Sequence, residues 1–144
     1  MNKKGILVVE DNITDGLVIK RTFSALTNEP IRIARNGKEA FDALVDDIND
    51  PKEDGIELPR IITVDINMPI MNGFEFIEAI KSREGLKEIP VIVLTSTQLP
   101  DEIKKAYRLG ANSFVVKPTE HEEFERKIEE IYHYWLDFVK LPQE

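Results

Sequence analysis

The stretch "RIITVDINMPIMNG", residues 60–73, contains a short apolar run, one acid and a turn, and this order decides the fold that we predict. Residues 61–64 are continuously apolar or β-branched, which is typical of a strand buried on both faces of a sheet. Asp65 follows the run directly, and Pro69 and Gly73 indicate a turn before a helix. The stretch therefore places a carboxylate where a buried strand reaches the surface.

Other strands and helices follow the same alternation along the chain. Similar apolar runs occupy residues 6–9, 91–94 and 114–116, and the alternating "IRIA" at 31–34 is typical of an edge strand. Helical spacing separates these runs, most clearly at residues 37–48 and between Pro100 and Gly110. Five strands alternating with five helices predict a doubly wound α/β fold, in which a parallel sheet carries helices on both faces. We expect a single domain over 1–144, with a C-terminal extension of about 130–144 and an acidic loop at 46–58.

Composition excludes several classes of function. The chain has 144 residues, of which 42% are hydrophobic and 32% charged, as in ordinary globular proteins. A formal net charge of -8 argues against nucleic acid and anionic membranes as partners. The chain has no cysteine, so thiol chemistry and thiolate metal sites are excluded. The opening "MNKKGILVVEDN" lacks the long apolar stretch of a signal peptide, and we expect a cytoplasmic protein.

Polar side chains follow four of the predicted strands. In a parallel sheet these strand ends share one edge, where ligands bind at a topological switch point. The residues that follow the strands are Glu10, Asp11, Asp65, Thr95, Ser96 and Lys117. A single acid at a strand end is usually a turn residue or a helix cap, but several positions that agree on one edge argue against that explanation.

This set of residues suits phosphoryl transfer. Clustered carboxylates repel one another unless a cation lies among them, and Mg²⁺ prefers such oxygen ligands. The metal would polarise a phosphoryl oxygen and leave one carboxylate free to attack phosphorus. Lys117 and Thr95 would contact the remaining phosphoryl oxygens. The residues therefore predict transfer of a phosphoryl group to an aspartate.

Four motifs, in order along the chain, resemble those of response-regulator receiver domains: "LVVEDN", "VDINMPIMNG", "PVIVLTS" and "GANSFVVKP". The resemblance implies a flavodoxin-like strand order of 2-1-3-4-5. It also implies a single-domain response regulator, phosphorylated by a sensor histidine kinase or a phosphotransfer protein. Such a protein is not an enzyme in the usual sense, because it catalyses only its own phosphorylation and dephosphorylation. No output domain follows, so we expect output through protein binding.

The resemblance also assigns roles to the residues at the strand ends. Asp65 would be phosphorylated, and Glu10 and Asp11 would hold Mg²⁺ directly or through water. Asp65 and the backbone carbonyl of Asn67 would complete the protein ligands of the metal. Lys117 would pair with Asp65 and later with the phosphate.

Three further expectations concern conformational change and the phosphodonor. Thr95 would be drawn toward the phosphoryl group, and Phe114 would turn inward to fill the space that Thr95 leaves. The peptide bond between Lys117 and Pro118 would be cis. His121 and His133 are predicted at the surface without a carboxylate base, so the phosphorylated histidine is expected on the partner.

The last helix, predicted from about Thr119 to Val139, is longer than the strands beneath it. Its first half carries a stripe that we expect to face the core, whereas its second half carries more apolar residues than one sheet can cover. Exposed apolar patches usually mark interfaces. We therefore predict a homodimer through Tyr132, Trp135, Leu136 and Val139, and the alternative is that the tail folds back on its own domain. The acidic loop and this ending also resemble single-domain regulators paired with phytochrome-type kinases.

The sequence opposes three other functions. A Mg²⁺-dependent aspartate-nucleophile phosphatase of the haloacid dehalogenase type needs a general acid two residues after its nucleophile, where this chain has Asn67. A flavodoxin needs a hydroxyl- and glycine-rich phosphate loop after the first strand, where this chain has "EDNITDG". A receiver-like scaffold that is never phosphorylated is opposed by the full set of acid, hydroxyl and lysine positions.

Overall fold

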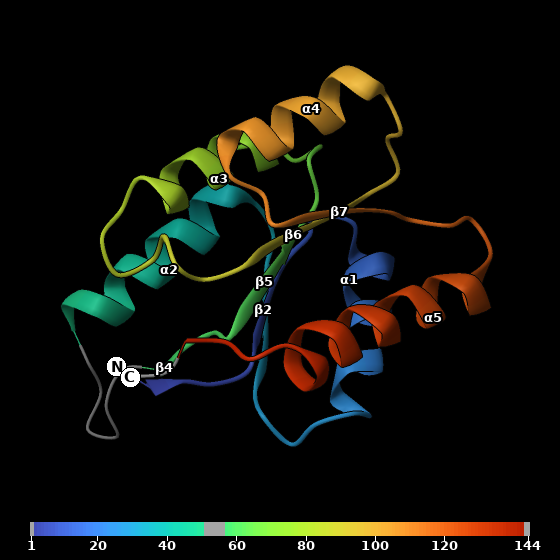
Figure 1. Cartoon of the computed structure of the whole chain (residues 1–144), viewed down its shortest axis with the longest axis horizontal. Helices are drawn as coiled ribbons and strands as arrows, with labels where there is room; N and C mark the ends of the chain where they lie inside the picture. The colour runs from blue at the N-terminus through green and yellow to red at the C-terminus, as the bar shows by residue number, and fades with distance from the viewer. Residues whose placement is uncertain (1, 51–56, 143–144) are drawn as a thin grey trace.

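The computed structural model describes residues 2–50 and 57–142, and a five-stranded parallel sheet forms its centre (Figure 1). The strand order is β3-β2-β5-β6-β7, which is the predicted 2-1-3-4-5 order when the strands of this sheet alone are counted. The elements that build this layer and cover it are β2 (Ile6–Val9), α1 (Ile13–Ser24), β3 (Ile31–Ala34), α2 (Gly37–Asn49), β5 (Ile61–Val64), α3 (Gly73–Lys81), β6 (Val91–Thr95), α4 (Pro100–Leu109), β7 (Ser113–Val116) and α5 (His121–Tyr132).

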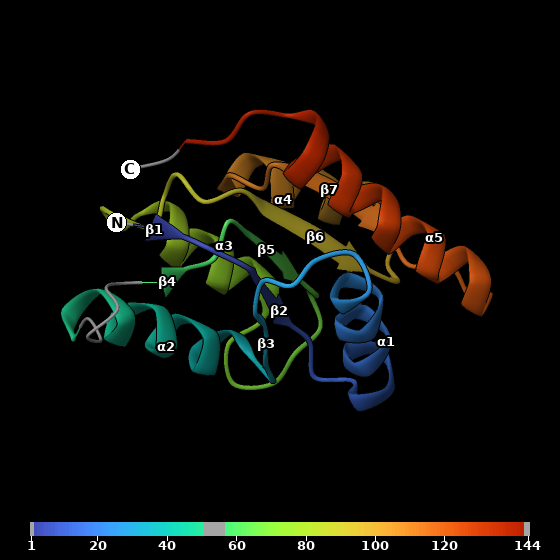
Figure 2. The same ribbon diagram turned by 90° about the horizontal axis from the view of Figure 1, so that it is seen from below.

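Helices cover both faces of the sheet, as predicted. Alternate residues of each strand point to opposite faces, so each face has its own apolar cluster. One cluster joins the sheet to α2, α3 and α4, and the other joins it to α1 and α5 (Figures 1 and 2). Strands β2, β5 and β6 lie in the middle of the sheet and are buried along their whole length. Their carboxyl ends therefore have fixed positions.

The register of the central strands places two of the predicted acids side by side. Strand β2 pairs with β5 from Ile6 opposite Ile61 to Val9 opposite Val64. The residues that follow these strands, Glu10 and Asp65, therefore leave the sheet at the same level.

Several segments differ from the prediction. Helix α2 continues to Asn49, and a short strand β4 (Glu57–Leu58) pairs with β1 (Asn2–Lys3), so the predicted loop at 46–58 is wrong at both of its ends. Residues 51–56 of that loop lie outside the described residues. Strand β7 was predicted to be buried but is only half-buried, because it lies at an edge of the sheet and pairs with β6 alone.

The C-terminal helix is long, but it is not one regular α-helix. Helix α5 begins at His121 and continues after Tyr132 as a π-helix, η1 (His133–Phe138). The side chains that pack partly against the core cluster beneath α1 and α5 are Tyr132, Trp135, Leu136 and Leu141. The side chain of Arg60 also donates a hydrogen bond to the Leu136 carbonyl at 3.3 Å. The tail therefore folds back on its own domain in part, although Phe138 remains 80% exposed.

Among the described residues, none of the helices combines the length and apolar character needed to cross a membrane.

Candidate functional site

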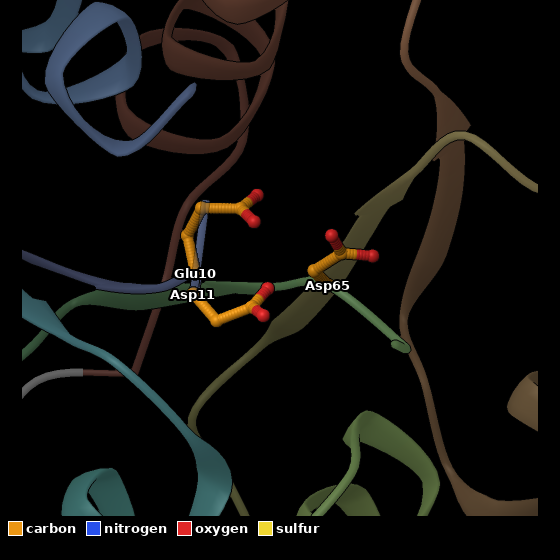
Figure 3. A group of neighbouring side chains, drawn as sticks. All are labelled: Glu10, Asp11 and Asp65. Atoms are coloured by element: carbon orange, nitrogen blue, oxygen red, sulfur yellow. The ribbon is translucent and has the colours of Figure 1, made fainter. Parts of the chain in front are cut away.

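Three carboxylates meet at the carboxyl ends of β2 and β5, and we call Glu10, Asp11 and Asp65 the acidic edge. Each offers one oxygen within 4.8 Å of the others, and Figure 3 shows Glu10 and Asp11 extending toward the strand end that carries Asp65. Glu10 is 1% exposed and Asp65 8%, whereas Asp11 is exposed to solvent. The group therefore combines buried and accessible oxygens, which suits a hard cation that is reached from solvent.

The backbone around Asp65 fixes its position. Its N–H donates to the Val9 carbonyl at 3.0 Å, and its Oδ1 accepts a hydrogen bond from the Ile66 N–H at 2.7 Å. Gly73 begins α3 directly behind this turn, and a Cβ atom there would lie 2.4 Å from the Asp65 carbonyl oxygen. Only glycine permits such a close approach of the two backbone segments.

Lys117 joins the three chain segments at this edge. Its Nζ lies 2.6 Å from Glu10 Oε1, 2.9 Å from Asp15 Oδ2 and 3.1 Å from Asp65 Oδ2. Asp15 was absent from the predicted set. The local sequence carries a signal for it, because Asn12 caps α1 by accepting the Asp15 N–H at 2.9 Å, and this cap places Asp15 in the first turn beside the acidic edge.

Burial and charge oppose each other in this group. Burial, and then the charge of Asp65, raise the pKa of Glu10 to about 7, although the hydrogen bond to Lys117 acts in the opposite direction. Burial alone would lower the pKa of Lys117. Its hydrogen bonds to Asp15 and Glu10 and the nearby negative charges outweigh that effect and raise the pKa above its ordinary value. Lys117 therefore stays charged and offsets part of the repulsion among the acids.

Thr95 ends β6 with a fully buried side chain. Its Oγ1 has no hydrogen-bond partner among the described residues, although buried hydroxyls usually have one. The backbone N–H of Lys117 donates to the Thr95 carbonyl at 2.7 Å, so the hydroxyl residue and the lysine lie on neighbouring strand ends. An acceptor near Asp65 could use this hydroxyl.

Three other expectations have mixed outcomes. Phe114 is half-buried and packs against the cluster under α2, α3 and α4. The described residues contain no cis peptide bond, so the expected cis bond before Pro118 is wrong. The peptide bond is trans, which is the form that bonds before proline favour by about 0.5–1 kcal/mol.

His121 and His133 are exposed as predicted. The expectation that no carboxylate serves them is wrong. Glu125 Oε1 lies 3.4 Å from His121 Nε2, and Asp137 Oδ2 lies 3.4 Å from His133 Nδ1, each one helical turn along the chain.

An open cleft adjoins the acidic edge. It has a volume of about 580 Å³ and lies between the turn after β5 and the first turns of α4. Asp11 and Asn67 are among the residues that line the cleft. The acidic edge can therefore be reached from solvent on this side.

Comparisons with known proteins agree on one family. A sequence model of the response regulator receiver domain matches residues 6–129. The chain is 37% identical over 138 residues to the probable methanogenesis regulatory protein FilR2 of Methanothrix harundinacea. The aligned region covers 95% of this chain and 86% of that protein. It is 30% identical over 143 residues to the response regulator Rcp1 of Synechocystis. That aligned region covers 96% of this chain and 93% of Rcp1.

Solved structures show the same similarity. The phosphorylated cyanobacterial phytochrome response regulator RcpA superposes with a TM-score of 0.87 at 30% identity, over 98% of this chain and 99% of that one. The Mn²⁺-bound form of Rcp1 superposes with a TM-score of 0.81 at 27% identity, over 96% of this chain and 99% of that one.

Proposed function

The chain belongs to the response regulator receiver domain family, and from this premise we propose that it is a single-domain phosphoacceptor whose Asp65 takes a phosphoryl group from a histidine kinase or a phosphotransfer protein. One observation carries the proposal. Asp65 lies at a strand end that solvent can reach, with the Lys117 ammonium 3.1 Å from its Oδ2 and two further carboxylates beside it. Residues 1–144 would form one receiver domain with a short C-terminal extension.

The proposed chemistry is an in-line displacement at phosphorus. An oxygen of Asp65 forms a bond to the phosphorus of a phosphohistidine while the P–N bond breaks, and the released imidazole takes up a proton from solvent. Lys117 neutralises one phosphoryl oxygen, and the Thr95 hydroxyl donates a hydrogen bond to another. Water later hydrolyses the acyl phosphate, so the chain would catalyse only its own phosphorylation and dephosphorylation.

The acidic edge suits Mg²⁺, because three carboxylates supply the hard oxygen ligands that this ion prefers. Glu10, Asp11 and Asp65 would hold it together with the carbonyl of Asn67. A bound divalent ion would supply positive charge where the phosphoryl oxygens meet the carboxylates. The Mn²⁺-bound structure of the relative Rcp1 supports a divalent ion in this family.

We further propose that Thr95 and Phe114 report the phosphorylation. The unpartnered Thr95 hydroxyl supports this role, since a phosphoryl oxygen would give it an acceptor. Phe114 lies on the half-buried edge strand next to β6, where a side chain has room to move. The likeness to RcpA, a phytochrome response regulator, supports a kinase of that type as the partner.

Self-association through the C-terminal tail is proposed as the output. The predicted contact residues are Tyr132, Trp135, Leu136 and Val139. Three of them pack partly on their own domain and Val139 is half-buried, so the exposed part of this surface consists mainly of the aromatic rings of Tyr134 and Phe138. Exposed aromatic side chains of this kind usually anchor protein interfaces.

Intact mass measurement after incubation with Mg²⁺ and acetyl phosphate tests the phosphoacceptor role. We expect the parent protein to gain one acid-labile phosphoryl group and Asp65→Asn to gain none. Asp137→Asn, which removes an exposed acid far along the chain, should behave like the parent. A label that persists in Asp65→Asn would contradict the proposal, and rapid turnover of added phosphomonoesters would favour the phosphatase alternative.

A further inference from the structure

We infer that the open cleft beside α4 is a docking site for a basic, apolar helical segment of a partner protein. This cleft, of about 580 Å³, is named the α4 cleft here. Pockets of this size accommodate a small ligand or a few side chains, rather than a whole domain surface. The inference concerns a surface next to Asp65 and does not depend on phosphorylation of that residue.

Part of the lining of the α4 cleft is apolar. Ile66, Met68 and Phe74 are among its lining residues, and Ile66 and Met68 are buried. Ile70 directly follows the lining residue Pro69 and is 77% exposed. A large aliphatic side chain is therefore exposed at the residue that follows the cleft lining in the chain.

Ile70 is unfavourable here for two independent reasons. Its φ is 70°, in the left-handed region that glycine and asparagine adopt readily but β-branched residues avoid. Its side chain also exposes apolar surface that water solvates poorly. Asparagine at this position would relieve both effects, so the free protein gains nothing from the isoleucine. A contact with a partner gives the apolar side chain a role.

The charge of the α4 cleft indicates which partner fits. Asp101 and Glu102 lie in the first turn of α4 and line the cleft, and neither has an ion-pair partner among the described residues. Lys105 is the one cationic side chain among the described lining residues, and its Nζ lies 4.5 Å from the centre of the Phe74 ring. Acids also suit a helix N-terminus, so these charges alone would not indicate a site. Together with Ile70 and the apolar lining residues, they favour a partner segment that carries arginine or lysine next to apolar residues.

Fluorescence anisotropy with a labelled amphipathic helical peptide, with arginine and leucine on one face, tests this inference. Saturating Mg²⁺ keeps the acidic edge occupied, so that it does not attract the peptide itself. We expect Ile70→Asn and the double variant Asp101→Asn/Glu102→Gln each to weaken binding roughly tenfold. Lys105→Gln should strengthen binding, a gain that misfolding cannot produce.

A matched control separates the α4 cleft from general attraction to an acidic protein. Glu122→Gln/Glu129→Gln makes the same change in charge at two exposed positions of α5 and should bind like the parent. Equal weakening in this control, or unchanged binding in Ile70→Asn, would overturn the inference. Asp65→Asn should still bind the peptide, so a failure of the phosphoacceptor proposal can be told apart from a failure of this one.

Discussion

At the scale of single residues, Glu10 links the site to pH. Its pKa rises from 4.5 to about 7 in the fold, mainly through burial. Between these values the folded protein holds a proton that the unfolded chain has lost, so the free energy of unfolding falls as pH rises. Without metal, we expect a loss of about 3 kcal/mol between pH 4.5 and 7.

Urea unfolding in EDTA at a series of pH values measures this effect. Glu10→Gln cannot ionise, so its stability should lack this component of the pH dependence. The difference between the two proteins isolates the contribution of Glu10 from that of other groups. Parallel stability curves for the parent and Glu10→Gln across this range would show that Glu10 ionises normally in the fold.

Ile70 provides a second test at this scale. Replacing it with asparagine removes a β-branched side chain from the left-handed region, where L-residues are strained by roughly 1–2 kcal/mol. We expect Ile70→Asn to raise the free energy of unfolding by about 1 kcal/mol. Ile13→Asn changes an isoleucine that is also exposed, but at the start of a helix, and should change stability by less than about 0.5 kcal/mol. Denaturant unfolding of both variants decides the matter, and a destabilised Ile70→Asn would contradict the strain argument.

At the scale of elements, the contact between β5 and α3 holds the acidic edge in place. A Cβ atom at Gly73 would lie 2.4 Å from the Asp65 carbonyl oxygen and 2.8 Å from the Ile66 Cα, and both are backbone atoms. We expect Gly73→Ala to lower the free energy of unfolding by about 2 kcal/mol and to slow phosphorylation by acetyl phosphate.

Gly16→Ala is the matched control, because a Cβ atom there meets nothing closer than 3.8 Å. This position lies in α1, where alanine is favoured over glycine, so the variant should gain roughly 0.5–1 kcal/mol. The thermal stabilities of the two alanine variants should therefore change in opposite directions, and only Gly73→Ala should be phosphorylated more slowly than the parent. Similar behaviour of both would mean that the close approach at Gly73 does not constrain the site.

The same scale shows what sequence can and cannot predict. The buried strands and the acids after them were predictable, because continuous apolar runs and strand ends depend on local pattern alone. Asp15 was missed, since its role follows from a helix cap that turns it toward a lysine 102 positions away. The half-burial of β7 and the pair β1–β4 depend on position within the whole sheet. The local sequence pattern also gives no indication of the change from α-helix to π-helix after Tyr132.

At the scale of the whole molecule, the tail determines the proposed self-association. Phe138 is 80% exposed and lies outside the core, so Phe138→Glu should leave thermal stability unchanged while it weakens self-association. Leu17→Glu introduces the same charge at an exposed apolar residue of α1 and should associate like the parent. Sedimentation velocity over a range of concentrations, with and without acetyl phosphate, measures this. A parent protein that sediments as a monomer under every condition would rule out the dimer.

The lone hydroxyl of Thr95 affects the energy balance of signalling. A buried polar group without a partner costs roughly 1–3 kcal/mol, and the unmodified fold bears this cost at the end of β6. A phosphoryl oxygen on Asp65 that accepts from this hydroxyl would remove much of this cost. Part of the free energy that drives the switch would then come from relief of this cost in the unphosphorylated protein, in addition to the free energy of the donor's high-energy bond.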